Sequence, residues 1–303
     1  MTDFPSYINL HREGILGERL EELLRLASPC TLCPRQCMAD RTGNDRGYCQ
    51  APYSLYISSA SPHFGEEEPL VGTGGSGTIF MTHCNLRCGF CQNYDISIRG
   101  DGVSCSADAL ADVMMDLQGK GCHNINFVTP THYVHQIVKA LPRAIQKGLT
   151  IPLVYNSGGY DSVEVIRLLD GIFDIYMPDI KFLDPALAAR YCQAEDYPSV
   201  VWEAVKEMHR QVGDLITDDR GIAGRGLIIR HLVMPGASAD TRRVLGRIAA
   251  ELSPDSYVNI MAQYYPCHRA GEFPEISQGL SAAEYQEAIR HARSIGLTRA
   301  SRR

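Results

Sequence analysis

Three cysteines, Cys84, Cys88 and Cys91, lie in the stretch MTHCNLRCGFCQN. Cysteine thiolates bind iron–sulfur clusters and zinc, and such sites are normally closed by four ligands. His83 is available as a fourth zinc ligand, but it directly precedes Cys84 and we expect its side chain to point away. A [4Fe–4S] cluster held by three cysteines instead leaves one iron open to a substrate or cofactor. The C-x3-C-x2-C spacing therefore predicts an open cluster, with zinc as the alternative.

A second group of cysteines has the spacing C-x2-C-x3-C-x11-C and consists of Cys30, Cys33, Cys37 and Cys49. Four thiolates complete a site, so this group predicts a structural zinc ion or a second [4Fe–4S] cluster, and both remain open. The surrounding segment is rich in turn-forming residues and has no room for an apolar core, so we expect a metal to stabilise it. The other cysteines are scattered and are expected to be small buried apolar residues: Cys105, Cys122, Cys192 and Cys267.

The chain has 303 residues, of which 45% are hydrophobic and 21% charged, so it can bury a sizeable core. Its formal net charge of −6 argues against a nucleic-acid partner. No apolar run approaches the roughly 20 residues of a membrane span, and the N-terminus does not resemble a secretory signal. We therefore expect a cytoplasmic protein without a membrane partner, in a compartment where thiols stay reduced and clustered cysteines bind metals.

From residue 77 onward, short apolar runs alternate with helical patterns. Six runs bounded by Gly, Pro or Asn predict buried strands at 77–82, 123–129, 151–156, 173–178, 226–234 and 257–263. Apolar periodicity predicts helices near 107–119, 132–147, 161–170, 184–213, 238–252 and 281–294. This alternation predicts a parallel sheet with right-handed crossovers, either a doubly wound sheet or a partial barrel.

The N-terminal part of the chain follows a different pattern. A helix is expected over residues 14–27, the four-cysteine segment follows, and residues 52–76 resemble loops and short extended pieces. We therefore predict two regions. Residues 1–69 form an N-terminal helix and metal-binding module, and residues 70–303 form the core with a C-terminal helix. The acidic run at 66–69 is typical of a solvated surface, with contact to a basic substrate as the alternative.

Candidate ligand-binding residues follow from the strand ends, because both architectures bind ligands where parallel strands end. The three-cysteine loop follows the first predicted strand, and Thr129 and Thr131 lie at the end of the second. Asn156 ends the third strand, where it could contact a ligand or form a turn. Asp179 and Lys181 follow the fourth strand, where they could contact a ligand or form an ion pair.

The three-cysteine loop, set after the first strand of a six-fold strand–helix chain, resembles the radical S-adenosylmethionine (SAM) superfamily. The stretches NINFVTPTHY, DIYMPDIKF and RHLVMPG further resemble a largely uncharacterised group within its pyruvate formate-lyase-activating-enzyme-like branch. The resemblance covers roughly residues 70–265. It implies an α/β fold, a partial (β/α)6 TIM-type barrel of the radical SAM kind, here with a small Cys-rich N-terminal extension.

The resemblance also implies the cofactors and an aromatic contact. Cys84, Cys88 and Cys91 would hold a [4Fe–4S] cluster whose open iron binds SAM, and Phe90 would pack near the adenine. The electron would come from a reductant such as flavodoxin or ferredoxin. The N-terminal four-cysteine site would hold either a second [4Fe–4S] cluster or zinc.

Further SAM contacts are implied at the strand ends. Asp179 and Lys181 match the Asp-x-Lys that contacts SAM near its ribose and carboxylate in activating enzymes, and Asn156 is expected to be a polar contact to SAM. Activating enzymes carry Gly-Gly-Glu after the second strand, whereas this chain has Thr129-Pro130-Thr131. Backbone carbonyls and a threonine hydroxyl can accept the same hydrogen bonds, but without the charge of a carboxylate. Membership of the true activase group therefore does not follow.

The implied reaction is reductive cleavage of SAM to a 5′-deoxyadenosyl radical, which abstracts hydrogen from a substrate. The cofactor carries this step, while the protein fixes the geometry and excludes solvent. Three alternatives for the overall function remain open. The enzyme could activate a glycyl radical on a protein partner, or it could modify a small molecule or peptide. A non-enzymatic iron–sulfur or zinc protein is the third alternative, and it would not cleave SAM.

Overall fold

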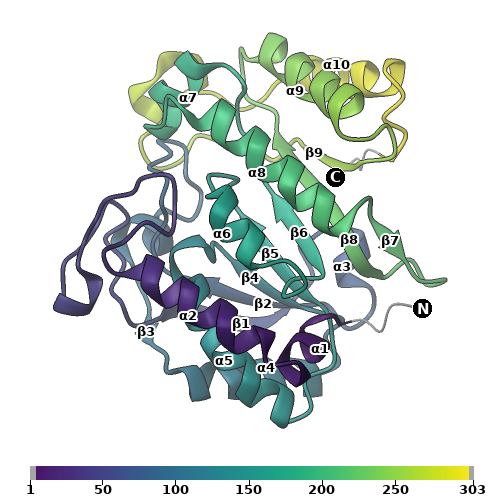
Figure 1. Cartoon of the computed structure of the whole chain (residues 1–303). Helices are drawn as coiled ribbons and strands as arrows, with labels where there is room; N and C mark the ends of the chain where they lie inside the picture. Colours follow the sequence, from purple (N-terminus) through teal and green to yellow (C-terminus); the bar gives the residue numbers. More distant parts are fainter. Residues whose placement is uncertain (1–4, 300–303) are drawn as a thin grey trace.

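The computed structural model of the protein describes residues 5–299 (Figure 1). Residues 1–4 of the predicted N-terminal module and residues 300–303 of the predicted core lie outside the described part. Six neighbouring strands run parallel, and each corresponds to a predicted strand. They are β2 (Ser76–Met81), β4 (Ile125–Val128), β5 (Leu153–Ser157), β6 (Ile175–Pro178), β8 (Ala223–Leu232) and β9 (Tyr257–Met261). The prediction of an α/β fold with a parallel sheet is confirmed. The sheet does not close, because neither β1 nor β3 on its first side pairs with β9 in the part of the chain that the structure describes.

Three further strands join the sheet in antiparallel pairs and were not predicted. β1 (Tyr56–His63) pairs with β2, β3 (Val103–Ser104) pairs with β1, and β7 (Ile216–Thr217) pairs with β8. The segment 52–76, expected to hold loops and short extended pieces, thus contains an eight-residue strand. β1 extends the sheet beyond the first parallel strand.

Most of the helices follow the parallel strands and pack on one side of the sheet, as Figure 1 shows for α4, α5 and α8. They are α1 (Tyr7–Arg12), α2 (Ile15–Ala27), α3 (Glu68–Val71), α4 (Ala107–Gly119), α5 (Val134–Gln146), α6 (Val163–Leu168), α7 (Pro185–Cys192), α8 (Tyr197–Val212), α9 (Ser238–Glu251) and α10 (Ala282–Ser294). None of these helices, within residues 5–299, is long and apolar enough to cross a membrane.

The single helix expected near 184–213 is wrong, because the structure contains two helices there. Gln193 ends α7 in a left-handed conformation, with φ of 54°. Pro198 then lies in the first turn of α8, where its missing N–H costs no hydrogen bond. The break matters for the site because it fixes Cys192 as the last residue of α7.

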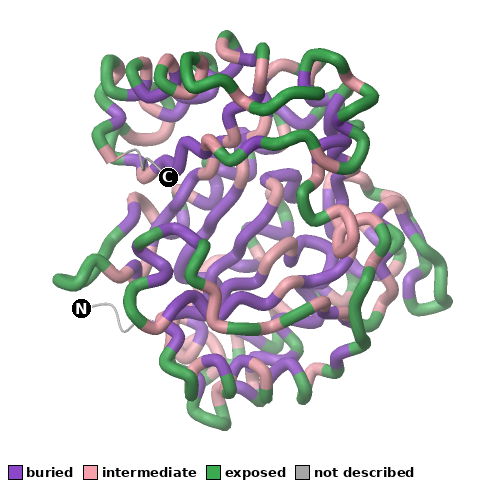
Figure 2. The backbone as a smooth tube through the Cα atoms, turned by 180° about the vertical axis from the view of Figure 1, so that it is seen from behind, coloured by how far each residue is buried: buried purple, intermediate pink, exposed green. Residues whose placement is uncertain are grey.

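The two faces of the sheet have different environments, because successive strand residues point to opposite sides. Phe127 and Tyr155 pack against Phe173 in edge-to-face contacts and belong to the main core under the helices. Val154 and Ile228 belong to a smaller apolar cluster on the other face. β5 and β6 are buried along their whole length, and the middle of the molecule is largely buried in Figure 2.

This smaller cluster gives way to polar residues toward the C-terminal ends of the strands. Asn156 lies two residues after Val154, and Arg230 lies two residues after Ile228, so each faces the same side as its apolar neighbour. The apolar residues pack together on this face, nearer the N-terminal ends of the strands. The polar side chains are therefore presented where a ligand is expected to bind.

The N-terminal segment packs closely against the core. α2 contacts α5 and α6, and the buried Arg41 donates hydrogen bonds to the carbonyl oxygens of His132 at 2.8 Å and Pro52 at 2.7 Å. The side chain of Arg41 is only 2% exposed. These contacts do not test the boundary between residues 69 and 70, which stays a prediction.

Candidate active site

The C-terminal ends of the parallel strands surround a cavity of about 240 Å³. Its lining contains the three loop cysteines and most of the residues predicted from the strand ends. These are Cys84, Cys88, Cys91, Phe90, Thr129, Asn156, Asp179 and Lys181. Residues from three strand ends and from one loop therefore meet in one place, as the parallel topology requires.

The second strand contributes only one of its two predicted residues to the cavity. Thr129 lines it, and its backbone has a φ of 60°, which is unusual for a β-branched residue. Thr131 does not line the cavity. Its hydroxyl donates a 2.6 Å hydrogen bond to the Asp161 carboxylate, and the side chain is buried within the core. The structure therefore does not bring the Thr131 hydroxyl to the ligand-binding side.

The three loop cysteines lie near one another and are largely buried. Burial, together with the neighbouring Cys88, raises the pKa of Cys84 to about 12. Burial raises the pKa of Cys91 as well. The backbone N–H of Leu86 donates to the Cys84 sulfur at 3.4 Å, and the N–H of Asn93 bonds to the Cys91 sulfur. Such N–H groups directed at sulfur tune iron–sulfur sites and orient their ligands.

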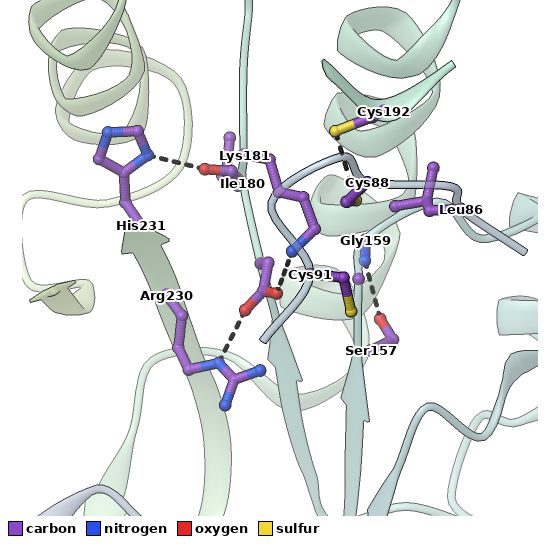
Figure 3. Close-up of polar contacts among 12 residues, drawn as sticks. Leu86, Cys88, Cys91, Ser157, Gly159, Ile180, Lys181, Cys192, Arg230 and His231 are labelled. Carbon is purple, nitrogen blue, oxygen red and sulfur yellow. Dashed lines mark hydrogen bonds and ion pairs between the residues drawn. The ribbon is translucent and has the colours of Figure 1, made fainter. Parts of the chain in front are cut away.

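Cys88 differs from the other two because it contacts a fourth thiol. Its sulfur lies 3.5 Å from the sulfur of Cys192, at the end of α7 (Figure 3). Cys192 was expected to be only a small buried apolar residue, so this contact was missed. Cys105 and Cys122 are buried as expected, whereas Cys267 is half-exposed.

The residue types and their placement fit a cluster with three thiolate ligands. All three cysteines come from one loop, line one cavity and have backbone amides nearby to stabilise charged sulfur. Within residues 5–299, no group of three or more His, Cys, Asp or Glu side chains is already arranged to hold a metal ion. His83 does not line the cavity, although it was considered as a zinc ligand.

A row of charged side chains lines the cavity, and its Lys181 lies near the cysteines (Figure 3). The Lys181 ammonium donates to Asp179 Oδ2 at 2.6 Å, and the Arg230 Nε donates to Asp179 Oδ1 at 2.8 Å. Arg230 Nη2 also donates to Asn156 Oδ1 at 2.7 Å. The ion pair considered for Asp179 and Lys181 is therefore present, and both residues also line the cavity.

The charged forms of Asp179, Lys181 and Arg230 stabilise one another and so offset the cost of burial. Burial alone would raise the pKa of Asp179, but Arg230 and Lys181 hold it below its ordinary value. Burial alone would lower the pKa of Lys181, but Asp179 holds it well above its ordinary value. All three residues are therefore charged at neutral pH, with one carboxylate between two cations. These three side chains together carry one net positive charge, and the two cations suit an acidic group on a ligand.

Tyr197 positions this strand end. Its hydroxyl accepts a hydrogen bond from the Lys181 N–H at 3.0 Å and lies 2.8 Å from the Asp179 carbonyl oxygen. Tyr197 was not predicted, since it lies in α8 and has no recognisable motif. Arg230 was also missed, although one basic residue in the apolar run GLIIRHLVM is a signal that could have identified it.

Comparison with known proteins identifies the family. Residues 78–245, which make up more than half of the chain, match the model of the radical SAM superfamily. The chain belongs to the radical SAM superfamily. This radical SAM protein is also similar to the uncharacterized protein MJ0674 of Methanocaldococcus jannaschii, with 31% identity over 310 residues that cover 98% of this chain and 85% of that protein. A solved structure of TYW1 with a lysine-pyruvate adduct bound is similar at a TM-score of 0.44 and 12% identity, covering 73% of each chain.

Membership in the superfamily has direct chemical consequences. This radical SAM protein is an enzyme that uses a [4Fe–4S] cluster and SAM and takes an electron from a reductant partner. When bound, the cluster supplies the electron that cleaves SAM reductively. The chain's own residues provide thiols and hydrogen-bonding groups in the same cavity.

The N-terminal cysteines of this radical SAM protein form a separate group. Cys30, Cys33 and Cys49 are buried, Cys37 is half-buried, and none of them lines the cavity. Backbone amides two residues further along the chain bond to three of the sulfurs. Burial raises the pKa of Cys33 to about 12, and Cys49 and Cys30 add to this shift. The thiols are therefore neighbours, and the metal that they bind stays a prediction.

Proposed function

We propose that the enzyme cleaves SAM at a cluster held by Cys84, Cys88 and Cys91, and that the resulting 5′-deoxyadenosyl radical abstracts hydrogen from a bound substrate. One observation carries the proposal. The three cysteines line the same cavity as the charged row through Asp179. The cavity therefore combines ligands for a cluster with groups that complement SAM.

The roles of individual residues follow from their hydrogen-bonding capacity. Lys181 and Arg230 are donors for the SAM carboxylate, while Asp179 and Asn156 can accept hydrogen bonds from the ribose hydroxyls or the amino group. The backbone at Thr129 offers a further acceptor in place of the carboxylate that activating enzymes use. Phe90 packs against Phe182 and Tyr264, and we propose that its ring also contacts the adenine.

The substrate class separates two versions of the proposal. An enzyme of the pyruvate formate-lyase-activating-enzyme-like branch would generate a glycyl radical on a protein partner, with flavodoxin or ferredoxin as its cytoplasmic reductant. The activase-like sequences after the strands support this version, and the Thr129-Pro130-Thr131 sequence counts against it. Radical modification of a small molecule or peptide is the second version.

The N-terminal module is proposed to hold its own metal centre. Four mutually close thiols in a segment with little regular structure support a closed site, which would be a second [4Fe–4S] cluster or zinc. We place the boundary between this module and the radical SAM core at residues 69 and 70. Iron and zinc contents of the anaerobically reconstituted protein separate the two metals. About eight irons per chain support two clusters, and about four irons with one zinc support the mixed case.

Anaerobic reconstitution followed by an assay for 5′-deoxyadenosine tests the proposed function. With dithionite and SAM, we expect the wild-type enzyme to form 5′-deoxyadenosine. The Cys84→Ala/Cys88→Ala/Cys91→Ala variant should form none, because it cannot hold the cluster. A matched control replaces two cysteines outside both groups, Cys105 and Cys122, with alanine and should retain activity. Equal product from the wild type and the triple variant would contradict the proposal, and no product from the wild type would favour a non-enzymatic metal protein.

A further inference from the structure

A second cavity, of about 370 Å³, adjoins the first. Both linings include Arg230, Met261 and Gln263, so the cavities meet at these side chains. The rest of the second lining comes from the segment just before α3 and from β9. A molecule bound there would lie next to the proposed SAM site.

The second cavity lies at the opening in the sheet. Glu67 precedes α3, near the start of β2, and Asn259 lies in β9, the last parallel strand. The Asn259 Nδ2 donates a 2.9 Å hydrogen bond to Glu67 Oε1, which joins residues 192 positions apart. Side chains therefore form the wall where the strands at the two ends do not pair.

Two hydrogen-bond acceptors in this wall have no partner among the described residues. Glu67 is 5% exposed and Asn259 is 6% exposed, so both are almost completely buried. Their mutual hydrogen bond uses Glu67 Oε1 and Asn259 Nδ2, and it leaves Glu67 Oε2 and Asn259 Oδ1 unpaired. A buried polar group without a partner costs about 1–3 kcal/mol, and more when it is charged. A ligand with hydrogen-bond donors would remove this cost.

The local charges favour a cationic donor over a neutral one. Glu66 is also buried beside the cavity, and its Oε2 lies 4.0 Å from Arg230 Nη1. The Arg230 guanidinium is already bonded to Asp179 and Asn156 in the first cavity. Burial raises the pKa of Glu66 to about 7, and Glu67 adds to this rise. Two carboxyl groups, those of Glu66 and Glu67, therefore lie near a single guanidinium, Arg230, which is also bonded to Asp179.

We propose that the second cavity binds a positively charged nitrogen group of the substrate, an ammonium or a guanidinium, through Glu67 and Asn259. This inference rests on the proposed function, because it identifies the occupant of the second cavity as the molecule that reacts beside SAM. A purely structural clamp between β9 and the segment before α3 would need only the hydrogen bond that is already made. Two acceptors without a hydrogen-bond partner, on residues that line the cavity, favour a binding site over such a clamp.

The same chemistry could come from a free amine or from a lysine or arginine side chain of a polypeptide. The test uses the reconstituted enzyme with SAM and without reductant, so that only binding is measured. Ligand-observed NMR titrations compare n-butylamine and n-butylguanidine with uncharged n-butanol. They also compare acetyl-Gly-Lys-Gly-amide with its norleucine analogue. We expect each charged probe to bind at least about tenfold more tightly than its neutral match. Tighter binding of the lysine peptide than of n-butylamine assigns the group to a polypeptide, and the reverse assigns it to a small molecule.

Two variants and one matched control link the preference to the named residues. Glu67→Gln keeps the shape of the side chain but removes its charge, and it should abolish the preference for charged probes. Glu68→Gln, at an exposed neighbouring position, should retain it. Asn259→Ala removes one acceptor and keeps the charge, so the preference should fall but persist. If Glu67→Gln does not fold with the wild-type iron content, the wild-type comparison and Asn259→Ala still decide the question.

Equal binding of charged and neutral probes by the wild type would overturn the inference. A preference that survives in folded Glu67→Gln would also overturn it. These results are independent of SAM cleavage, because no reductant is present. If the wild type prefers the charged probes but forms no 5′-deoxyadenosine when reductant is added, the proposed function alone is overturned.

Discussion

The two cysteine groups differ in what surrounds them. The loop carrying Cys84, Cys88 and Cys91 begins at the end of a buried parallel strand and opens onto a cavity lined with charged groups. The N-terminal group, which includes Cys30 and Cys33, lies in a segment with one short 3₁₀ helix and does not line that cavity. Three thiols beside a cavity suit a reactive site, whereas four thiols in an irregular segment suit a structural one. The group of three thiols thus lies at the cavity, and the group of four lies away from it.

Removing each cysteine group in turn tests this comparison, and we expect it to give the largest changes in thermal stability. Replacing Cys30, Cys33, Cys37 and Cys49 with alanine should lower the thermal unfolding midpoint by more than about 10 °C, because a structural metal contributes folding free energy directly. The triple variant of the loop should change the midpoint much less, since the loop is attached to a buried strand. Calorimetry on the reconstituted proteins measures both midpoints. An equal loss in the two variants would remove the distinction between a structural and a reactive site.

A smaller but still large effect is expected from Asp179→Asn. The substitution leaves the buried Lys181 and Arg230 cations without their shared carboxylate, and breaking a buried ion pair in this way costs about 3–5 kcal/mol. We expect the free energy of unfolding to fall by this amount and SAM affinity to fall with it. Chemical denaturation and equilibrium binding of SAM measure the two effects. Asp219→Asn, at an exposed turn position, is a control that should change neither. Unchanged SAM affinity in folded Asp179→Asn would separate the charged row from SAM binding.

The pH dependence of stability gives a more modest test, at Glu66. Its pKa rises from an ordinary value of 4.5 to about 7 in the folded protein, mainly through burial. The folded state therefore holds a proton that the unfolded state loses first. The resulting stability is fully present below pH 4.5 and is lost as the pH rises through 7. The contribution is on the order of 3 kcal/mol.

Glu66→Gln should remove this dependence, because the amide does not titrate. We expect the stability of the variant relative to the wild type to increase between pH 5 and about pH 7 and then to level off. Denaturant midpoints of both proteins at four pH values measure the change. Asp174, whose pKa burial also raises to about 7, is common to both proteins and cancels in the comparison. A constant difference between the two proteins would mean that Glu66 is already ionised at pH 5.

The sequence was sufficient for the parallel strands and for most of the first cavity. Buried parallel strands appear as short apolar runs, and their shared C-terminal edge brings Asn156 and Asp179 together regardless of sequence distance. β1 was missed because YISSASPH, at Tyr56–His63, has few apolar residues and contains proline. Pairing with β2 stabilises it, and that contact cannot be read from local composition.

The acidic run shows a second reason for failure. Glu66 and Glu67 were expected to be solvated, yet both are buried, while Glu68 is exposed as expected. Their burial depends on Arg230 and Asn259, which are far away in the sequence. Thr131 illustrates the opposite error. It follows the correct strand, but its hydroxyl bonds to Asp161 rather than reaching the ligand.

The most direct test of the distinction between the two cysteine groups is the electron paramagnetic resonance spectrum of the reduced, reconstituted enzyme with and without SAM. An iron with an open position changes its signal when SAM coordinates, whereas a cluster closed by four thiolates does not. We expect SAM to shift the signal in the wild type and in the variant lacking the four N-terminal cysteines. The variant lacking Cys84, Cys88 and Cys91 should show no shift. A SAM-dependent shift that survives loss of these three cysteines would contradict the assignment of the open site.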